Sequence, residues 1–345
     1  MKKFSILFLI IGLLALLGLT GCTSNNNTSN KTAAKAEAKA GKTDLRGVTL
    51  KVGQTGWGSN EEAIKAAGLD NTPYKVEYSV FQGGNLILEA MTAGHIDFGI
   101  TSEIPPIFSS LSKNGDQSKV IAIQQSNTLQ QELVVPKGSK IKNVADLKGK
   151  KVAYVNSTTA HYFLLKMLQK AGLTWNDITP VQLSTADGLT ALIGGNVDAL
   201  ASYGNAILAA HQNGARTLES AKNILSGNFP INVATAAIND PVKHAAIVDY
   251  IERLNKASDW QRKHPEVWSK IVATNTKQPY DQALQTFREG EKQRPTHIIP
   301  LSETNTHSEQ DISNVFSSVE LIQGKVNVQS FWSHSFDKEL AKVIK

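Results

Sequence analysis

The sequence contains little cysteine and few aromatic residues. Cys22 is the single cysteine among 345 residues, and Phe, Trp and Tyr together make up 7% of the chain. One cysteine excludes a disulfide within the chain and a structural zinc site built on cysteine thiolates. With 41% hydrophobic residues, 25 glycines and 11 prolines, the composition also excludes collagen-like and disordered classes. The length predicts two core-forming units.

Signatures of common catalytic sites are absent as well. The chain has no Gly-x-Ser-x-Gly elbow, no Gly-x-x-x-x-Gly-Lys-Ser/Thr phosphate loop and no His-Glu-x-x-His motif. None of the eight histidines is followed by another four residues later, which leaves helix-borne metal ligation without support. We therefore expect a protein that is not an enzyme and has no metal site and no cofactor.

Basic residues in excess occur only at the N-terminus. The formal net charge is +6, but residues 1–43 hold six lysines against one acid, Glu37. The remainder carries 30 basic and 29 acidic residues, so no basic domain is left to bind a phosphate backbone. The charge pattern predicts no nucleic-acid partner.

The N-terminal segment has the pattern of an export signal. Two lysines precede an apolar run at 4–19, which at sixteen residues is shorter than the roughly 20 residues that span a bilayer. The run ends in Leu-Thr-Gly-Cys at 19–22, which resembles the lipobox of bacterial lipoproteins, in which the cysteine is acylated. We expect a signal peptide at 1–21 and a lipidated Cys22 followed by a flexible spacer to residue 44. The alternative is a core cysteine after an uncleaved anchor.

The expected location is the outer face of a cell membrane. The spacer is rich in Asn, Ser, Thr and Lys, which favours a Gram-positive cell, with a periplasmic location as the alternative. In both cases the protein would be held at the membrane by lipid without spanning it.

From residue 45 onward, β-rich runs alternate with amphipathic helical patterns, which predicts α/β structure with parallel sheets. Residues 80–102 align without gaps on 181–203, so that Asp97 meets Asp198 and both segments read strand, loop, helix, strand. We expect two similar lobes. The predicted boundaries assign 45–136 and 237–345 to lobe I and 137–236 to lobe II.

The loops that follow the expected strands are candidates for a ligand site, because ligands of open α/β sheets bind beyond the carboxyl ends of strands. These loops contain no Lys or Arg and are rich in glycine, hydroxyl and amide groups. The candidate binding residues are Gln54, Thr55, Gly56, Trp57, Gln82, Gly83, Gly84, Asn85, Thr101, Ser102, Glu103, Ser157, Thr158, Thr159, His161, Tyr203 and Asn205. This composition favours a small anion held by backbone N–H groups and hydroxyls. The alternative is that these residues only cap helices and form turns.

Two candidates, His161 and Glu103, could also support acid–base chemistry in a secreted enzyme. A catalytic His161 would need an orienting carboxylate, and the sequence identifies none. Glu103 has the alternative role of a first-turn acid that complements a helix dipole. The enzyme remains the rival hypothesis from another functional class.

Several segments resemble the aliphatic-sulfonate-binding proteins of ABC importers. These are Phe-Gly-Ile-Thr-Ser-Glu-Ile-Pro-Pro-Ile at 98–107, Asp-Leu-Lys-Gly-Lys-Lys-Val-Ala at 146–153, Ser-Thr-Thr-Ala-His at 157–161, Gly-Asn-Val-Asp-Ala at 195–199 and Arg-Pro-Thr at 294–296. The resemblance implies a type II periplasmic-binding-protein fold, with two lobes joined by a two-segment hinge. It also implies a monomer that takes up a sulfonate for sulfur supply and delivers it to a permease driven by an ATPase.

The resemblance also implies which loops contact the ligand. The implied pocket residues are Gln54, Thr55, Gly83, Gly84, Thr101 and Ser102 in lobe I, and Ser157, Thr158, Thr159 and Tyr203 in lobe II. The sequence departs from the family pattern at two places, and the chemical identity of the ligand's tail is therefore left open. Ser102-Glu103 stands where relatives often have Asp, and Tyr203-Gly204-Asn205 stands where they often have Trp-Asp-Pro. Nitrate, taurine and a pyrimidine precursor of thiamine remain alternative ligands of the same fold.

Overall fold

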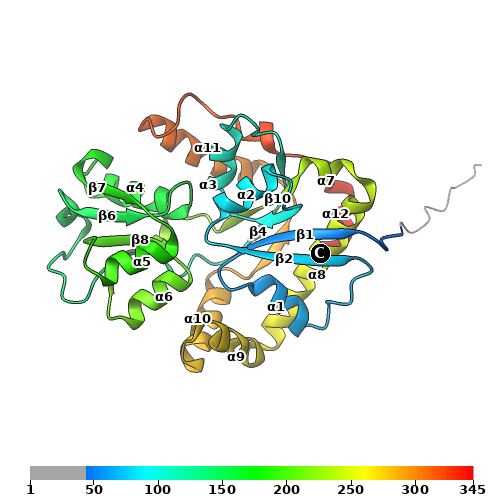
Figure 1. The fold of residues 1–345 in the computed structure, drawn as a ribbon, viewed down its shortest axis with the longest axis horizontal. Coiled ribbons are helices and arrows are strands. Elements are labelled where there is room, and N and C mark those ends of the chain that lie inside the picture. Colours follow the sequence, from blue (N-terminus) through cyan, green and yellow to red (C-terminus); the bar gives the residue numbers. More distant parts are fainter. Residues whose placement is uncertain (1–43, 345) are drawn as a thin grey trace, which may run out of the picture. The chain divides into compact units, whose positions relative to one another are not determined.

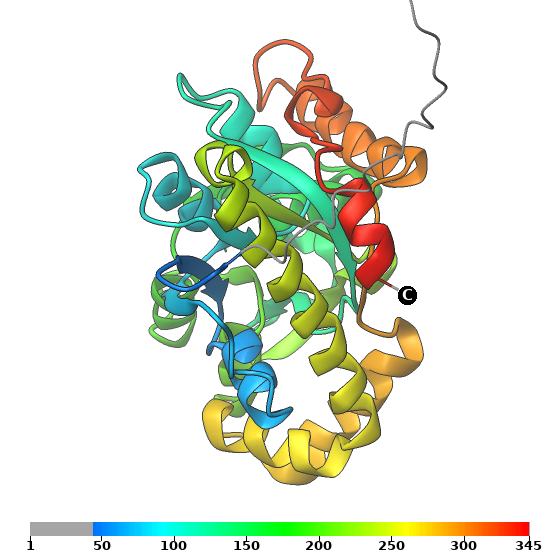
Figure 2. The same cartoon turned by 90° about the vertical axis from the view of Figure 1, so that its right-hand side faces the viewer.

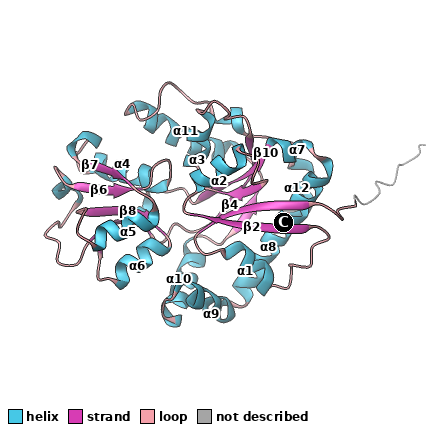
Figure 3. Cartoon of the chain, in the orientation of Figure 1, coloured by secondary structure: helices cyan, strands magenta, loops and turns pink. Residues whose placement is uncertain are grey.

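The computed structural model describes residues 44–344, which belong to one compact unit (Figure 1). Two separate sheets, of six and five strands, are each flanked by helices (Figure 3). This arrangement confirms the predicted α/β class. The expected signal peptide, the lipidated Cys22 and the spacer lie outside the described residues.

The larger sheet has the strand order β11-β4-β10-β3-β1-β2. Strands β1 to β3 are parallel to one another, whereas β10 is antiparallel to both β3 and β4, and β11 is antiparallel to β4. Its strands are β1 Thr49–Thr55, β2 Lys75–Phe81, β3 Phe98–Ile100, β4 Ser118–Gln125, β10 Asn228–Ala234 and β11 His297–Ile299.

The smaller sheet has the order β7-β6-β8-β5-β9. Strands β6, β7 and β8 are parallel, and β5 pairs antiparallel with β8 and β9. Its strands are β5 Gln131–Val135, β6 Lys151–Tyr154, β7 Thr179–Gln182, β8 Ala199–Tyr203 and β9 Arg216–Ser220.

Helices cover both sheets. Those of the larger sheet are α1 Ser59–Ala66, α2 Gly84–Thr92, α3 Ile104–Ser110, α7 Thr235–Asn239, α8 Pro241–Lys263, α9 Pro265–Thr276, α10 Tyr280–Gln293, α11 Glu303–Ser318 and α12 Asp337–Val343. Those of the smaller sheet are α4 Thr159–Lys170, α5 Thr185–Ile193 and α6 Asn205–Gln212. Short 3₁₀ turns occur at Val144–Leu147, Trp175–Asp177, Ala221–Asn223 and Val328–Phe331. Between residues 44 and 344, none of the helices combines the length and the apolar character that crossing a bilayer requires.

Each sheet has a buried apolar core of its own. In the larger sheet, Leu50 and Val52 of β1 pack with Tyr250 of α8, and Figure 2 shows α8 and α12 side by side over this sheet. In the smaller sheet, Val152 of β6 packs with Phe163 of α4. A further cluster joins the two parts, because α4 packs its Tyr162 and Leu165 against α11. The expectation of two core-forming units is therefore met.

Strand pairing places both boundaries between the lobes several residues before the predicted positions. Strand β5 was assigned to lobe I but pairs with β8 and β9, and β10 was assigned to lobe II but pairs with β3 and β4. The chain therefore crosses between the sheets at 126–130 and again at 221–227. The predicted boundaries came from the simplest wiring of two similar lobes, but the partner of a strand depends on long-range contacts. Below, lobe I means residues 44–125 and 228–344, and lobe II means 131–220.

The internal repeat corresponds to the same unit in both lobes. Strands β2 and β3 flank α2 in lobe I as β7 and β8 flank α5 in lobe II. The aligned aspartates share one backbone contact: Asp97 Oδ2 accepts from Lys51 N at 3.0 Å, and Asp198 Oδ2 accepts from Lys151 N at 2.8 Å. Each carboxylate thus fixes the start of one strand to the start of its neighbour.

Candidate ligand-binding cleft

A cavity of about 220 Å³ lies at the carboxyl ends of β1, β3 and β8, between the two lobes. We call it the central cavity. Its lining residues are Thr55, Gly84, Ile100, Thr101, Ser102, Asn127, Leu129, Gln131, Thr158, Thr159, Tyr203, Gly204 and Phe229. Seven of the residues proposed from sequence are among them: Thr55, Gly84, Thr101, Ser102, Thr158, Thr159 and Tyr203. Loops from both lobes thus meet around one space, and no charged side chain lines it.

Two helices begin at the wall of the central cavity. Helix α2 starts at Gly84 after an N-cap, Gly83, that provides no side-chain hydrogen bond, and α4 starts at Thr159. Neither helix has an acidic residue in its first turn. Free N–H groups and the positive ends of two helix dipoles therefore lie at this wall, which favours an anion. Glycine is needed at 84, because a Cβ there would lie 2.9 Å from Thr101 Cβ.

Further hydrogen-bond donors are available in the central cavity. The hydroxyls of Thr55, Ser102 and Thr159 line it and form no side-chain hydrogen bond with another of residues 44–344. Gln131 is buried, and its Oε1 is covered and has no hydrogen-bond partner among residues 44–344. Its Nε2 is therefore the polar side-chain atom left to contact a ligand. These groups can all donate to an oxyanion.

The hydroxyls of Thr101 and Thr158 are already engaged within the protein. Thr101 Oγ1 donates to Ser102 O at 2.9 Å and accepts from Asn232 Nδ2 at 3.0 Å. Thr158 Oγ1 donates to Val155 O at 2.7 Å and accepts from Ala160 N at 3.2 Å, as an N-cap of α4. Because a hydroxyl has one proton to donate, these two side chains hold the loops of the site in place.

Tyr203 and Gln82 connect the lobes next to the central cavity. The Tyr203 hydroxyl donates to Gln82 O at 3.4 Å, and Thr185 Oγ1 donates to Gln82 Oε1 at 2.6 Å. Burial raises the pKa of Tyr203 to about 12, and the neighbouring Thr158 hydroxyl opposes the rise only partly. The phenol therefore stays neutral and remains a donor at the boundary of the lobes.

Other proposed residues line neighbouring cavities. Gly56, Gln82 and Asn205 line one of about 360 Å³ that shares Thr55, Tyr203 and Gly204 with the central cavity, and that we call the outer cavity. Trp57, again with Asn205, lines one of about 310 Å³. Gly83, Asn85 and Gln82 line a cavity of about 280 Å³, and Ser157 lines another of about 500 Å³ together with Asn85.

Gln54, Glu103 and His161 line none of these cavities. Gln54 Oε1 instead accepts from Glu61 N at 3.3 Å and so fixes the first turn of α1. Glu103 is buried and accepts hydrogen bonds from Ser226 and, at 3.3 Å, from Asn228 Nδ2. Burial raises the pKa of the Glu103 carboxyl above its usual range, while hydrogen bonds from Ser226 and other neighbours oppose the rise. Its contacts anchor the second crossing segment.

His161 lies in an aromatic cage rather than at the ligand. Its ring centroid is 4.9 Å from that of Tyr154, 5.0 Å from those of Trp175 and Phe316, and 5.9 Å from that of Phe108. Neither ring nitrogen has a hydrogen-bond partner among the described residues. Burial lowers the pKa of His161 to about 4. The contacts correspond to a neutral packing residue, and no carboxylate orients the imidazole as a general base requires.

Sequence reasoning missed the residues that the first crossing segment, the start of β5 and β10 contribute. Asn127, Leu129, Gln131 and Phe229 all line the central cavity. The polar run Gln-Gln-Ser-Asn-Thr-Leu-Gln-Gln at 124–131 was the available signal, because a polar stretch between two strands is a candidate crossing. The crossing was instead expected at 136–137, after β5.

The chain is similar to known proteins over most of its length. The family model "NMT1/THI5 like" matches residues 65–266. A protein of Escherichia coli strain K12 that is named for binding aliphatic sulfonates is 30% identical over 265 residues, covering 75% of this chain and 79% of its own length. The alkanesulfonate-binding protein SsuA from Xanthomonas axonopodis pv. citri, solved bound to MOPS, superposes with a TM-score of 0.74 at 25% identity, covering 84% of this chain and 99% of its own.

The same fold also occurs in an enzyme. The desulfurization enzyme DSZB superposes with a TM-score of 0.59 at 16% identity, covering 85% of this chain and 99% of its own. This likeness concerns the fold alone. The similarity to the two binding proteins confirms the predicted type II periplasmic-binding-protein fold and the resemblance found in the sequence. The chain, matched over more than half of its residues, belongs to the NMT1/THI5-like family.

Proposed function

We propose that this protein is the extracytoplasmic solute-binding component of an ABC importer and that it captures a small organosulfonate between its lobes. One observation carries the proposal: the central cavity joins the N-termini of α2 and α4 to free hydroxyls and has no charged lining. A sulfonate spreads one negative charge over three oxygens, and these can accept from N–H and O–H donors of both lobes. The names of the two similar binding proteins support the same ligand class.

The lining of the central cavity makes the alternative ligands less suitable. Taurine carries an ammonium group, and no acidic side chain lines the cavity. The nearest acid along the chain, Glu103, is occupied by Ser226 and Asn228. Nitrate would leave most of the roughly 220 Å³ unfilled. An enzyme using His161 and Glu103 is disfavoured because neither side chain lines the cavity.

Binding would favour a closed form of the two lobes. The ligand's oxygens would bridge α2 of lobe I and α4 of lobe II, adding to the contacts that Gln82 makes with Tyr203 and Thr185. A ligand that touches both lobes binds the closed state better and shifts the population toward it. The closed form would then dock on the permease, and the two crossing segments would bend.

The proposed location rests on the sequence before residue 44. A Cys22 acylated after signal cleavage would hold the protein on the outer face of the membrane, with residues 22–44 as a tether. Replacing this residue, Cys22→Ser, should release the protein from the membrane fraction and abolish its labelling with radioactive palmitate. Retention of the label in the variant would contradict the anchor while leaving the ligand proposal untouched.

A thermal-shift panel on residues 44–345 tests the ligand. The panel contains methanesulfonate, ethanesulfonate, taurine, MES, nitrate, sulfate and a hydroxymethylpyrimidine. A ligand at a hundred times its Kd should stabilise the protein by about 2.7 kcal/mol. We expect Tm to rise with sulfonates alone. A rise of Tm with nitrate or the pyrimidine alone would contradict the proposal that the ligand is a sulfonate. Mass spectrometry of the recovered ligand should find it unchanged, whereas turnover would favour the enzyme.

A further inference from the structure

A second cavity, of about 310 Å³, lies where the first crossing segment meets four helices of lobe I and α6 of lobe II. Its apolar wall includes Trp57, Leu254, Trp268, Val272 and Phe287. The rings of Trp57 and Trp268 have centroids 5.6 Å apart at an interplanar angle of 33°. We call this space the tryptophan cavity. The function proposed above, capture of an anionic headgroup, makes no use of it.

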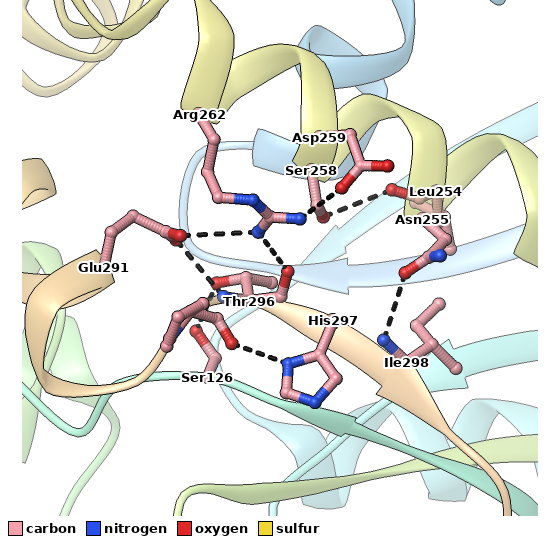
Figure 4. Close-up of polar contacts among 11 residues, drawn as sticks. Ser126, Leu254, Asn255, Ser258, Asp259, Arg262, Glu291, Thr296, His297 and Ile298 are labelled. Atoms are coloured by element: carbon pink, nitrogen blue, oxygen red, sulfur yellow. Dashed lines mark hydrogen bonds and ion pairs between the residues drawn. The ribbon is translucent and has the colours of Figure 1, made fainter. Parts of the chain in front are cut away.

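The tryptophan cavity presents no unpaired charge. Glu291 is the charged residue of its lining, and this carboxylate accepts from Arg262 Nη1 at 3.3 Å and from Thr296 N at 3.2 Å (Figure 4). Arg262 also donates to Thr296 O at 2.5 Å, and the hydroxyls of Ser126 and Thr296 are 2.8 Å apart. The charge of the Glu291 carboxylate is thus balanced by a partner within the protein, so the cavity suits an uncharged group.

The remaining polar lining can recognise a hydrogen-bonding group. Gln278 is buried, its Nε2 donates to Thr276 Oγ1 at 2.8 Å, and its Oε1 has no partner within residues 44–344. A buried acceptor without a partner is costly, and a ligand that donated a hydrogen bond to this oxygen would remove that cost. Aromatic faces beside an amide acceptor suit a ring that bears a hydroxyl or N–H group.

The tryptophan cavity is contiguous with the anion site. Asn127 lines both the tryptophan cavity and the central cavity. Asn205 lines both the tryptophan cavity and the outer cavity, which in turn shares Thr55 and Tyr203 with the central cavity. The segment 55–58 lines all three spaces, with Thr55 in the central cavity, Gly56 in the outer cavity and Trp57 in the tryptophan cavity, and it has positive φ angles at Gly56 and Gly58.

We propose that the tryptophan cavity is the tail subsite of the same ligand site, and that the physiological ligand is an organosulfonate with a neutral, ring-containing tail. The inference rests on the proposed function, because it places the anionic group in the central cavity. The tail then passes Asn127 and its ring packs against Trp57.

Isothermal titration with residues 44–345 tests the inference through a ligand series with one headgroup. Ethanesulfonate has no ring, whereas benzenesulfonate and 4-hydroxybenzenesulfonate add a ring without and with a donor. In wild type, each ring ligand should bind more tightly than ethanesulfonate. Trp57→Leu should weaken the ring ligands by about three- to tenfold, as expected for loss of an aromatic contact, and should leave ethanesulfonate within twofold.

Two further variants keep the test decisive. Thr286 is half-buried in the lining, so Thr286→Phe fills the cavity and should give the same selective loss if Trp57→Leu does not fold. Phe81 lines the outer cavity, so Phe81→Leu is the matched control and should leave both ligand classes unchanged.

The outcomes separate the two proposals. If no sulfonate binds to wild type, the proposed function fails. If ethanesulfonate binds but rings add nothing, or if Phe81→Leu rather than Trp57→Leu weakens the ring ligands, the headgroup site stands and the tail subsite is overturned.

Discussion

Acid should destabilise this protein through His161, and replacing that residue should remove the effect. The side chain is 3% exposed, lies among four aromatic rings and has no hydrogen-bond partner among the described residues. Burial lowers its pKa from 6.5 to about 4. The unfolded chain therefore binds a proton below pH 6.5, whereas the folded protein does so only near pH 4.

The magnitude follows from linkage between proton binding and folding. A group with a lowered pKa in the folded state contributes stability above its unfolded pKa and loses it as the pH falls toward the folded value. Each pKa unit corresponds to about 1.4 kcal/mol, so the full loss is about 3 kcal/mol. By pH 5, about 2 kcal/mol of it should be gone.

Two variants without a titrating group, His161→Phe and His161→Gln, isolate this contribution. Their constant offsets from wild type will differ, since Phe retains an aromatic contact and Gln does not. The pH-dependent part of each difference must be the same, because it belongs to His161. Tm is measured for the three proteins from pH 7.5 to pH 5. The difference in Tm between each variant and wild type should shift in favour of the variant by about 4 °C between pH 7.5 and pH 5. Parallel curves for the three proteins would refute the reasoning, because they would mean that His161 protonates as readily in the folded protein.

Three further predictions concern other buried groups. Gln131→Leu removes one amide donor from the central cavity and should weaken sulfonate binding by about tenfold. Titration calorimetry measures the change, and an unchanged Kd would exclude the contact. Gly84→Ala places a Cβ 2.9 Å from Thr101 Cβ and should abolish binding while the protein still folds, as checked by circular dichroism. Burial raises the pKa of the Glu309 carboxyl well above its usual value, and repulsion from Glu103 adds to the rise, so the contribution of Glu309 to stability should be lost as the pH rises from about 4.5. Glu309→Gln, whose carbonyl can still accept from Trp332, should therefore gain Tm relative to wild type as the pH rises from 5 to 8, and a difference in Tm that stays constant with pH would count against a buried neutral acid.

Local sequence features were enough to predict the α/β class and the repeated unit. The alignment of Asp97 with Asp198 identified two carboxylates with the same backbone contact in the two lobes. The crossing points could not be predicted in this way, because β5 and β10 are fixed by their antiparallel partners, and those lie about 70 and 110 residues away in sequence. Turn signals mark where a strand ends and not which sheet it joins.

The loops of the site were predictable, but the orientation of their side chains was not. Because the carboxyl ends of parallel strands meet at one edge, Thr55, Ser102 and Thr159 were expected at one space, and all three line it. His161 follows Thr159 by two residues on α4, and a helix turns by about 200° over that distance. The same helix therefore presents one residue to the ligand cavity and the other to α11, where the aromatic cage lies.

The two crossing segments make ligand binding and lobe movement depend on the same residues. Ser126 N donates to Gly227 O at 3.0 Å, so the segments lie side by side. Gly227 has φ +76°, and a Cβ there would lie 2.5 Å from Ser126 O, so only glycine allows this approach. Asn127 and Leu129 of the first segment line the central cavity, while Glu103, next to the cavity residue Ser102, is bonded to Ser226 of the second. A ligand in the central cavity therefore contacts the first segment directly and the second through Glu103, and any bend that changes the angle between the lobes must rearrange the residues that hold the ligand.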